Sequence, residues 1–103
     1  MRRPLSFLLA CMVLQAGEGG MAARAADEMP AGVASCSGCH ALSRTVDTPV
    51  PRLVGRKADE LVLAMREFKA GTRPATVMGR LAKGFSDEEI AALSTWFAGQ
   101  PDP

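Results

Sequence analysis

The chain has 103 residues, with twelve Lys and Arg, eleven Asp and Glu, and a formal net charge of +1. This near-neutral balance argues against a nucleic-acid-binding protein, since such proteins are strongly basic. The length allows one small domain. The sequence contains no strand signal, internal repeat or low-complexity run, and its helical periodicity predicts an all-α domain.

The first 25 residues have the features of a secretory signal peptide. Met1-Arg2-Arg3 is positively charged, residues 5–14 are nearly all apolar, and Ala23-Arg24-Ala25 is a small-residue cleavage site. The apolar stretch is shorter than the roughly 20 residues of a membrane-spanning helix. We therefore expect cleavage after Ala25 and export of residues 26–103 to the periplasm. Lipid attachment at Cys11 is the alternative reading of this segment.

Residues 26–103 form a very small domain whose charge is close to −1, because they hold nine Lys and Arg against ten Asp and Glu. Chains of this size seldom obtain enough stability from a hydrophobic core alone. Cys36 and Cys39 are the only cysteines of this segment. A disulfide between them would close a short loop and would constrain the unfolded chain very little. A larger stabilising element is therefore expected.

The first predicted helix runs from Pro30 to Leu42, with Asp27 and Glu28 suited to the positive end of its dipole. Residues 43–57 contain two prolines and a glycine, which predicts a loop. The second helix is expected at 58–70, with one apolar stripe and a stop at Gly71. The stripe consists of Leu61, Ala64, Met65 and Phe68, whereas Asp59, Glu60, Arg66 and Lys69 are expected to face elsewhere.

The last helix has the clearest start signal. Ser86 and Glu89 have the spacing of a capping box, and Phe85 and Ile90 have the spacing of a hydrophobic staple. Ile90, Leu93 and Phe97 are expected to line one face, and Gly99 with Pro101 ends the helix.

The segment C-S-G-C-H, residues 36–40, contains both of these cysteines and the only histidine. A structural zinc site needs four ligands, and no fourth Cys or His is present. A thioredoxin-type C-x-x-C should follow a strand in a βαβ unit, and no strand pattern precedes this one. The third reading is c-type haem attachment, in which Cys36 and Cys39 bond to the vinyl groups and His40 binds the iron. This reading also supplies the missing core element and is the one we adopt.

Three methionines are candidates for the sixth iron position, because no second histidine is available. Met65 lies on an apolar helical stripe, where methionine usually fills the core, and Met29 is too close to the attachment helix. Met78 lies in the predicted loop A-T-V-M-G-R-L-A, residues 75–82, which could cross the far face of the haem. We expect His40/Met78 ligation, although Met78 could instead be an ordinary loop hydrophobe. Six-coordinate iron leaves no place for a substrate, which favours electron transfer over enzyme catalysis.

The sequence resembles the class I cytochromes c over nearly all of residues 26–103. C-S-G-C-H matches the attachment motif of that family, and P-R-L-V-G, residues 51–55, is similar to its P-x-L-x-G loop. The resemblance implies three main helices around one covalently bound haem and places the methionine ligand at Met78. It also implies that the Pro51 carbonyl accepts a hydrogen bond from Nδ1 of His40, and that the Gly32-Val33 region packs against Trp96-Phe97.

Residues 67–93 are similar in more detail to the cytochrome subunit of flavocytochrome c sulfide dehydrogenases, and more loosely to cytochromes of the c4 and c-553 kinds. This resemblance implies a flavoprotein that oxidises sulfide as the electron donor, and a further carrier or oxidase as the acceptor. Many relatives carry two haem domains, whereas this chain has one C-x-x-C-H. A free-standing respiratory carrier, or a haem sensor with an open sixth position, are the alternatives.

A run of basic residues provides a candidate docking surface. We define the basic cluster as the eight Lys and Arg residues between 52 and 83: Arg52, Arg56, Lys57, Arg66, Lys69, Arg73, Arg80 and Lys83. The cluster could steer an acidic redox partner, or it could be an ordinary solvated face. Arg56 and Lys57 could instead pair with haem propionates.

Overall fold

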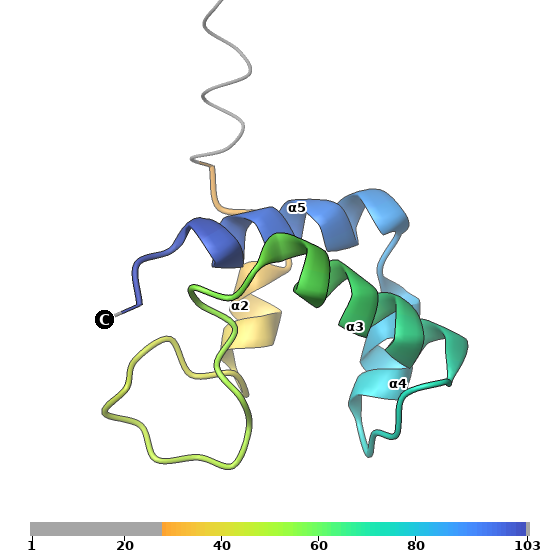
Figure 1. The fold of residues 1–103 in the computed structure, drawn as a ribbon, viewed down its shortest axis with the longest axis horizontal. Helices are drawn as coiled ribbons and strands as arrows, with labels where there is room; N and C mark the ends of the chain where they lie inside the picture. The colour runs from red at the N-terminus through yellow and green to blue at the C-terminus, as the bar shows by residue number, and fades with distance from the viewer. Residues whose placement is uncertain (1–27, 103) are drawn as a thin grey trace, which may run out of the picture.

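The computed structural model describes residues 28–102, and within this range the regular elements are all helical, which confirms the all-α prediction. They are α2 (Val33–Ser37), α3 (Ala58–Ala70), α4 (Met78–Leu81), the 3-10 helix η1 (Ala82–Gly84) and α5 (Asp87–Gly99) (Figure 1). The expected signal peptide and Cys11 lie outside the described residues. In the described range, no helix has the length and apolar character needed to cross a bilayer.

Helix α3 has the predicted bounds and end. Gly71 adopts the left-handed conformation with φ of 78°, and its N–H reaches the carbonyl oxygens of Glu67 and Phe68. This is the glycine C-cap that an L side chain would strain. Leu61 is buried, while Met65 and Phe68 are half-buried. Lys69, expected to face away from the stripe, is half-buried, and its Nζ donates to the Phe85 carbonyl at 2.6 Å.

Helix α5 begins with the predicted capping box. The Ser86 hydroxyl accepts from the Glu89 N–H, and the Glu89 carboxylate accepts from the Ser86 N–H. Three acidic residues in the first turn, Asp87, Glu88 and Glu89, complement the positive end of the helix dipole. Ile90, Leu93 and Phe97 are all buried, as their spacing predicted. This helix is therefore fixed by both its cap and its apolar face.

The first helix is much shorter than the predicted range of 30–42. Helix α2 covers only Val33–Ser37, and turns flank it on both sides. The Ser37 hydroxyl donates to the Val33 carbonyl at 2.8 Å, and Gly38 follows at the C-cap. Serine and glycine are weak helix formers, and the serine competes for a backbone acceptor, so the helix ends here. The motif histidine consequently lies in a turn after the helix.

The segment predicted as a loop around Met78 also differs from expectation. Met78 is the first residue of α4, which continues directly into η1. Val77 caps this short helix, and its carbonyl accepts from the N–H groups of Arg80 and Leu81. By contrast, residues 43–57 form a long loop without regular structure, as predicted.

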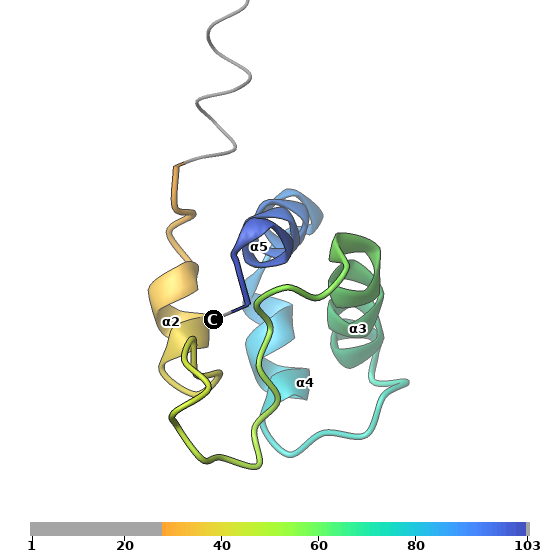
Figure 2. The same cartoon turned by 60° about the vertical axis from the view of Figure 1, so that its left-hand side comes forward.

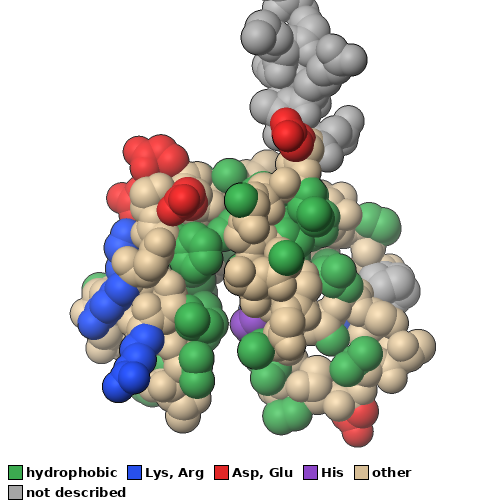
Figure 3. Space-filling model, turned by 180° about the vertical axis from the view of Figure 1, so that it is seen from behind, with side chains coloured by type: hydrophobic (Ala, Val, Ile, Leu, Met, Phe, Trp, Pro, Cys, Tyr) green, Lys and Arg blue, Asp and Glu red, His purple; other side chains and the backbone are tan. Residues whose placement is uncertain are grey.

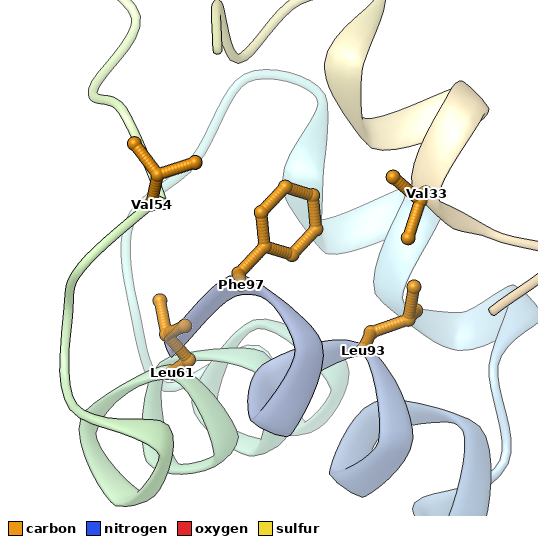
Figure 4. Packing of buried hydrophobic residues seen from close by; sticks show 5 residues of the cluster. All are labelled: Val33, Val54, Leu61, Leu93 and Phe97. Carbon is orange, nitrogen blue, oxygen red and sulfur yellow. The ribbon is translucent and has the colours of Figure 1, made fainter. Parts of the chain in front are cut away.

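The core lies where α5, α3 and α2 meet. Helix α3 packs against α5 and also contacts α4 and η1 (Figure 2). Phe97 occupies the centre of the main cluster, between Val54 and Leu61 on one side and Val33 and Leu93 on the other (Figure 4). Trp96 and Cys36 pack against this cluster. The expected meeting of the two terminal helices is thus present, with Val33 against Phe97.

Candidate functional site

A cleft divides the lower part of the molecule, and the single histidine lies on one of its walls (Figure 3). The turn after α2 and the loop 43–57 form one side of the molecule, and α3 with α4 form the other (Figure 1). The residues singled out from the sequence are therefore distributed over both sides: the C-S-G-C-H segment on the first and Met78 on the second. The contacts of each group indicate what the cleft could bind.

His40 is held by one hydrogen bond to the loop. Its Nδ1 lies 2.5 Å from the carbonyl oxygen of Pro51. A carbonyl oxygen only accepts, so Nδ1 carries the proton and Nε2 of the neutral ring keeps its lone pair. This is the tautomer that a metal ligand requires, with its second nitrogen oriented by the backbone. The contact implied by the resemblance is present.

The two cysteines lie in the helical turn directly before His40. The Cys36 carbonyl accepts from the N–H groups of both Cys39 and His40, at 3.2 and 2.9 Å. Both cysteines are free thiols; Cys36 is half-buried and Cys39 is exposed. Burial raises the pKa of the Cys36 thiol above its ordinary value, against a smaller lowering by a backbone hydrogen bond. The turn therefore presents two separate thiols and an imidazole within five residues.

The loop that carries Pro51 is tied to the segment after α5. Asp102 accepts from Nε of Arg44 at 3.2 Å and from Nη2 of the same residue. Nη1 of Arg52 lies 3.0 Å from Oδ1 of Asp102, yet its orientation makes no hydrogen bond, so this buried atom lacks a directed partner. The sequence analysis missed Asp102. The position of Arg52 beside Pro51 was the available signal, but nothing in the sequence linked it to residue 102.

Hydrophobic side chains lie on both walls of the cleft (Figure 3), and several large apolar residues of the segments that carry His40 and Met78 are exposed. Leu42 and Val46 follow His40 in the chain, whereas Val77 and Leu81 flank Met78; between 42% and 55% of each side chain is exposed. Exposed apolar side chains that gather on both sides of a cleft indicate a ligand-binding surface. Two thiols, an imidazole with a free nitrogen and apolar walls match the chemistry of haem c. The residues present therefore fit this group.

The three methionines occupy different environments. Met78 is half-buried at the start of α4, and Gly79 beside it packs near the Phe68 carbonyl of α3. Met65 is half-buried on α3, on the face that contains Leu61. Met29 precedes α2, with 59% of it exposed. Met65 and Met78 both belong to the side of the molecule formed by α3 and α4, with Met65 within α3 and Met78 at the start of α4 (Figure 1).

The competing readings of the C-x-x-C segment obtain no support. Within residues 28–102, no group of three or more His, Cys, Asp or Glu side chains is placed to hold a metal ion. Cys36 lies on the short helix α2 and Cys39 follows it, and no strand precedes this helix in the described range. A thioredoxin-type site needs that strand.

The basic cluster separates into paired and unpaired members. Arg52 pairs with Asp102, Arg73 with Glu67 at 2.7 Å, and Lys69 bonds to a backbone carbonyl. The remaining five members are exposed and make no ion pair with any described residue: Arg56, Lys57, Arg66, Arg80 and Lys83. These five are available to a partner. On the face drawn in Figure 3, basic side chains lie directly beside acidic ones.

Comparisons with known proteins point in the same direction. The chain is 38% identical over 63 residues to the cytochrome subunit of sulfide dehydrogenase from Chlorobaculum tepidum, covering 61% of this chain and 57% of that protein. It is 31% identical over 96 residues to a cytochrome c4 from Pseudomonas aeruginosa, covering 90% of this chain and 48% of the relative.

A third relative is the thiosulfate dehydrogenase electron acceptor of Stutzerimonas stutzeri, 32% identical over 70 residues, which are 64% of this chain and 32% of that protein. No family model matches the chain. The chain spans between about a third and about three fifths of the length of these relatives. The names of these relatives describe cytochromes and an electron acceptor. The helical fold of the described residues and these matches together show that the chain is similar to c-type cytochromes.

Proposed function

We propose that the chain is an exported monohaem c-type cytochrome that transfers single electrons, with haem bound through Cys36 and Cys39 and with His40 and Met78 as iron ligands. The observation that carries the proposal is the hydrogen bond between His40 Nδ1 and the Pro51 carbonyl. It supports ligation because it assigns the proton of the neutral ring to Nδ1, which makes Nε2 the ligating atom, and because it orients the ring from the loop. The signal-like residues 1–25 support export to the periplasm.

Each residue of the site has a separate task in this proposal. Cys36 and Cys39 would form the thioether bonds to the haem vinyl groups. When bound, haem supplies an iron that changes by one electron, and a thioether ligand raises its reduction potential.

The surrounding side chains would keep the site dry. Leu42, Val46, Val77 and Leu81 are apolar and lie next to the two ligands in the chain. Their contact with a porphyrin would exclude water from the iron. Low solvent access reduces the reorganisation that accompanies a change of charge, so these residues would favour electron transfer over reaction with a substrate.

For the partner, we favour a flavoprotein that oxidises sulfide, with this chain as the haem subunit that accepts its electrons. The support is the similarity to a sulfide dehydrogenase cytochrome subunit and the five unpaired basic residues, which suit an acidic docking face. A free-standing electron carrier is the second candidate, favoured by the similarity to a thiosulfate dehydrogenase electron acceptor. A haem sensor would require that Met78 leave the iron accessible.

Haem attachment can be tested by producing the full chain in a bacterium that matures c-type cytochromes. Intact mass spectrometry should show a chain beginning at Ala26 with one haem that acid acetone does not extract. Cys36→Ser and Cys39→Ser should each leave a single thioether, whereas Cys11→Ser is the matched control and should change nothing. A wild-type protein without haem, or a lipid on Cys11, would contradict the corresponding part of the proposal.

The partner can be tested by affinity purification of the tagged cytochrome from its native host. We expect a larger flavoprotein to co-purify and to reduce the haem when sulfide is added. Reduction without a stable complex would favour the free-standing carrier. Rapid binding of carbon monoxide by the reduced wild type would favour the sensor.

A further inference from the structure

We infer that Asp102 is a positioning residue for His40, acting through the loop that carries Pro51. The inference rests on the haem ligation proposed above, in which His40 binds the iron. It concerns a residue far from the C-x-x-C-H segment in sequence and not in contact with the histidine. Its basis is the small number of contacts that hold the loop.

Residues 41–52 have few polar ties to the rest of the described chain. Their internal hydrogen bonds are local, between Ser43 and Thr45 and between Val50 and Thr48. Only two other sets of polar contacts reach beyond this stretch within residues 28–102: the His40–Pro51 hydrogen bond and the contacts of Arg44 and Arg52 with Asp102. The position of the Pro51 carbonyl therefore depends on Asp102.

The Asp102 carboxylate joins the two ends of this stretch. Arg44 donates to both of its oxygens, and Arg52, directly after Pro51, lies 3.0 Å from Oδ1. A two-point guanidinium–carboxylate contact fixes direction as well as distance. The two arginines lie on either side of Pro51 in sequence, so one carboxylate restrains the chain before and after the carbonyl that His40 needs.

The segment that presents Asp102 is itself fixed to α5. The Gln100 N–H donates to the Phe97 carbonyl, and its side-chain amide donates to the Trp96 carbonyl at 3.1 Å. The Phe97 carbonyl also accepts from the Gly55 N–H at 3.0 Å. A Cβ added to Gly55 would lie 3.3 Å from Cβ of Asp102, which shows how closely the two segments approach. The position of α5 therefore determines the position of Asp102. Asp102 in turn holds the loop, and the Pro51 carbonyl of this loop orients the His40 ring.

The test measures the hydrogen bond itself. In the reduced, diamagnetic protein, proton NMR gives the rate at which the Nδ1 proton of His40 exchanges with solvent. We expect Asp102→Asn to raise this rate by about threefold or more, a modest effect because the ion pairs are partly exposed. Glu67→Gln, which removes the Arg73 pair of similar exposure on α3, is the matched control and should leave the rate unchanged.

The outcomes separate this inference from the proposed function. Wild-type protein that carries no covalent haem contradicts the ligation on which the inference depends, whatever Asp102 does. If the wild type carries haem but its Nδ1 proton exchanges as fast as in Asp102→Asn, the positioning role of Asp102 is wrong while the ligation stands. The positioning role is also wrong if Glu67→Gln raises the exchange rate as much as Asp102→Asn does. If Asp102→Asn fails to retain haem, Arg44→Gln gives the same measurement with Arg52 still in place, and an unchanged rate there also overturns the role.

Discussion

Gly32 and Leu93 bring α2 and α5 into close contact: a Cβ on Gly32 would lie 3.1 Å from Cδ1 of Leu93. The same Cβ would lie 2.9 Å from Cε1 of Phe85. Because residue 32 has no side chain, helix α2, which contains Cys36, can pack closely against α5. No other glycine in residues 28–102 is this confined by side chains.

We expect Gly32→Ala to lower the free energy of unfolding by about 1–3 kcal/mol, because the added methyl overpacks a buried contact. Gly99→Ala is the matched control, since a Cβ there meets nothing within 4 Å. It should be neutral or stabilise slightly, by up to about 1 kcal/mol. Urea denaturation of the haem-loaded variants measures both. Equal urea midpoints for Gly32→Ala and wild type would show that α2 and α5 can move apart to accept the methyl group without a loss of stability.

The sixth ligand is predicted to be Met78. Ferric iron bonded to a thioether has a weak charge-transfer band in the near-red, so Met78→Ala should abolish this band and let the reduced protein bind carbon monoxide. The reduction potential should fall, since a thioether ligand raises it. Absorption spectroscopy and a redox titration give all three readouts.

Met65→Leu is the control for this experiment, because Met65 is half-buried on the core-facing side of α3. The replacement is close in volume and should keep the band at a cost below about 1.5 kcal/mol. A band that survives Met78→Ala and disappears in Met65→Leu would falsify the assignment.

Arg56 and Lys57, two adjacent unpaired members of the basic cluster at the start of α3, should control association with the redox partner. Charge reversal of Arg56 or Lys57 should slow the second-order rate of reduction, and added salt should slow the wild type, because ions screen surface charges beyond about 8–10 Å. Stopped-flow reduction at several salt concentrations measures both effects. Arg66→Glu is the control: it is equally free of ion pairs but lies on the exposed face of α3. An equal effect in all three variants would mean that net charge, not a docking site, sets the rate.

The Asp102 contacts should weaken in acid. The pKa of Asp102 is held below its ordinary value of 3.8, chiefly by the Arg44 hydrogen bond and further by the charges of both arginines, against a smaller rise from desolvation. Because the folded pKa lies below the unfolded one, the stabilisation is complete above about pH 4 and is lost as the pH falls through the folded pKa.

The urea midpoints of wild type and Asp102→Asn should therefore differ by a constant amount from pH 7 to pH 5 and converge below pH 4. Asp47→Asn, at an exposed carboxylate that makes no ion pair among residues 28–102, is the control. A difference between wild type and Asp102→Asn that persists at pH 2.5 would exclude an ionic origin.

The sequence predicted the two long helices well, because their signals are local. The capping box at Ser86 and Glu89, the glycine stop at Gly71 and the apolar spacing of α5 all act within a few residues. The His40–Pro51 contact was also anticipated, but through the family resemblance, since no local pattern links two residues eleven positions apart.

The errors have physical causes of their own. Helix α2 was predicted too long because the prediction extended it through the whole C-S-G-C-H segment. It did not take into account that Ser37 and Gly38 are weak helix formers, and the helix ends at these residues. The partner of Lys69 was not predicted, because its long side chain reaches the Phe85 carbonyl between η1 and α5, which only the tertiary fold brings close. The Asp102 contacts were missed for the same reason, because they join segments 58 residues apart.

Five basic residues that are exposed and without an ion pair among the described residues leave positive charge on the surface of a protein whose total charge is close to zero. A local charge of this kind attracts an oppositely charged surface whatever the net charge is. The protein should therefore bind a cation-exchange resin at low ionic strength even above its isoelectric point. Retention on such a column would report the distribution of charge and not its sum.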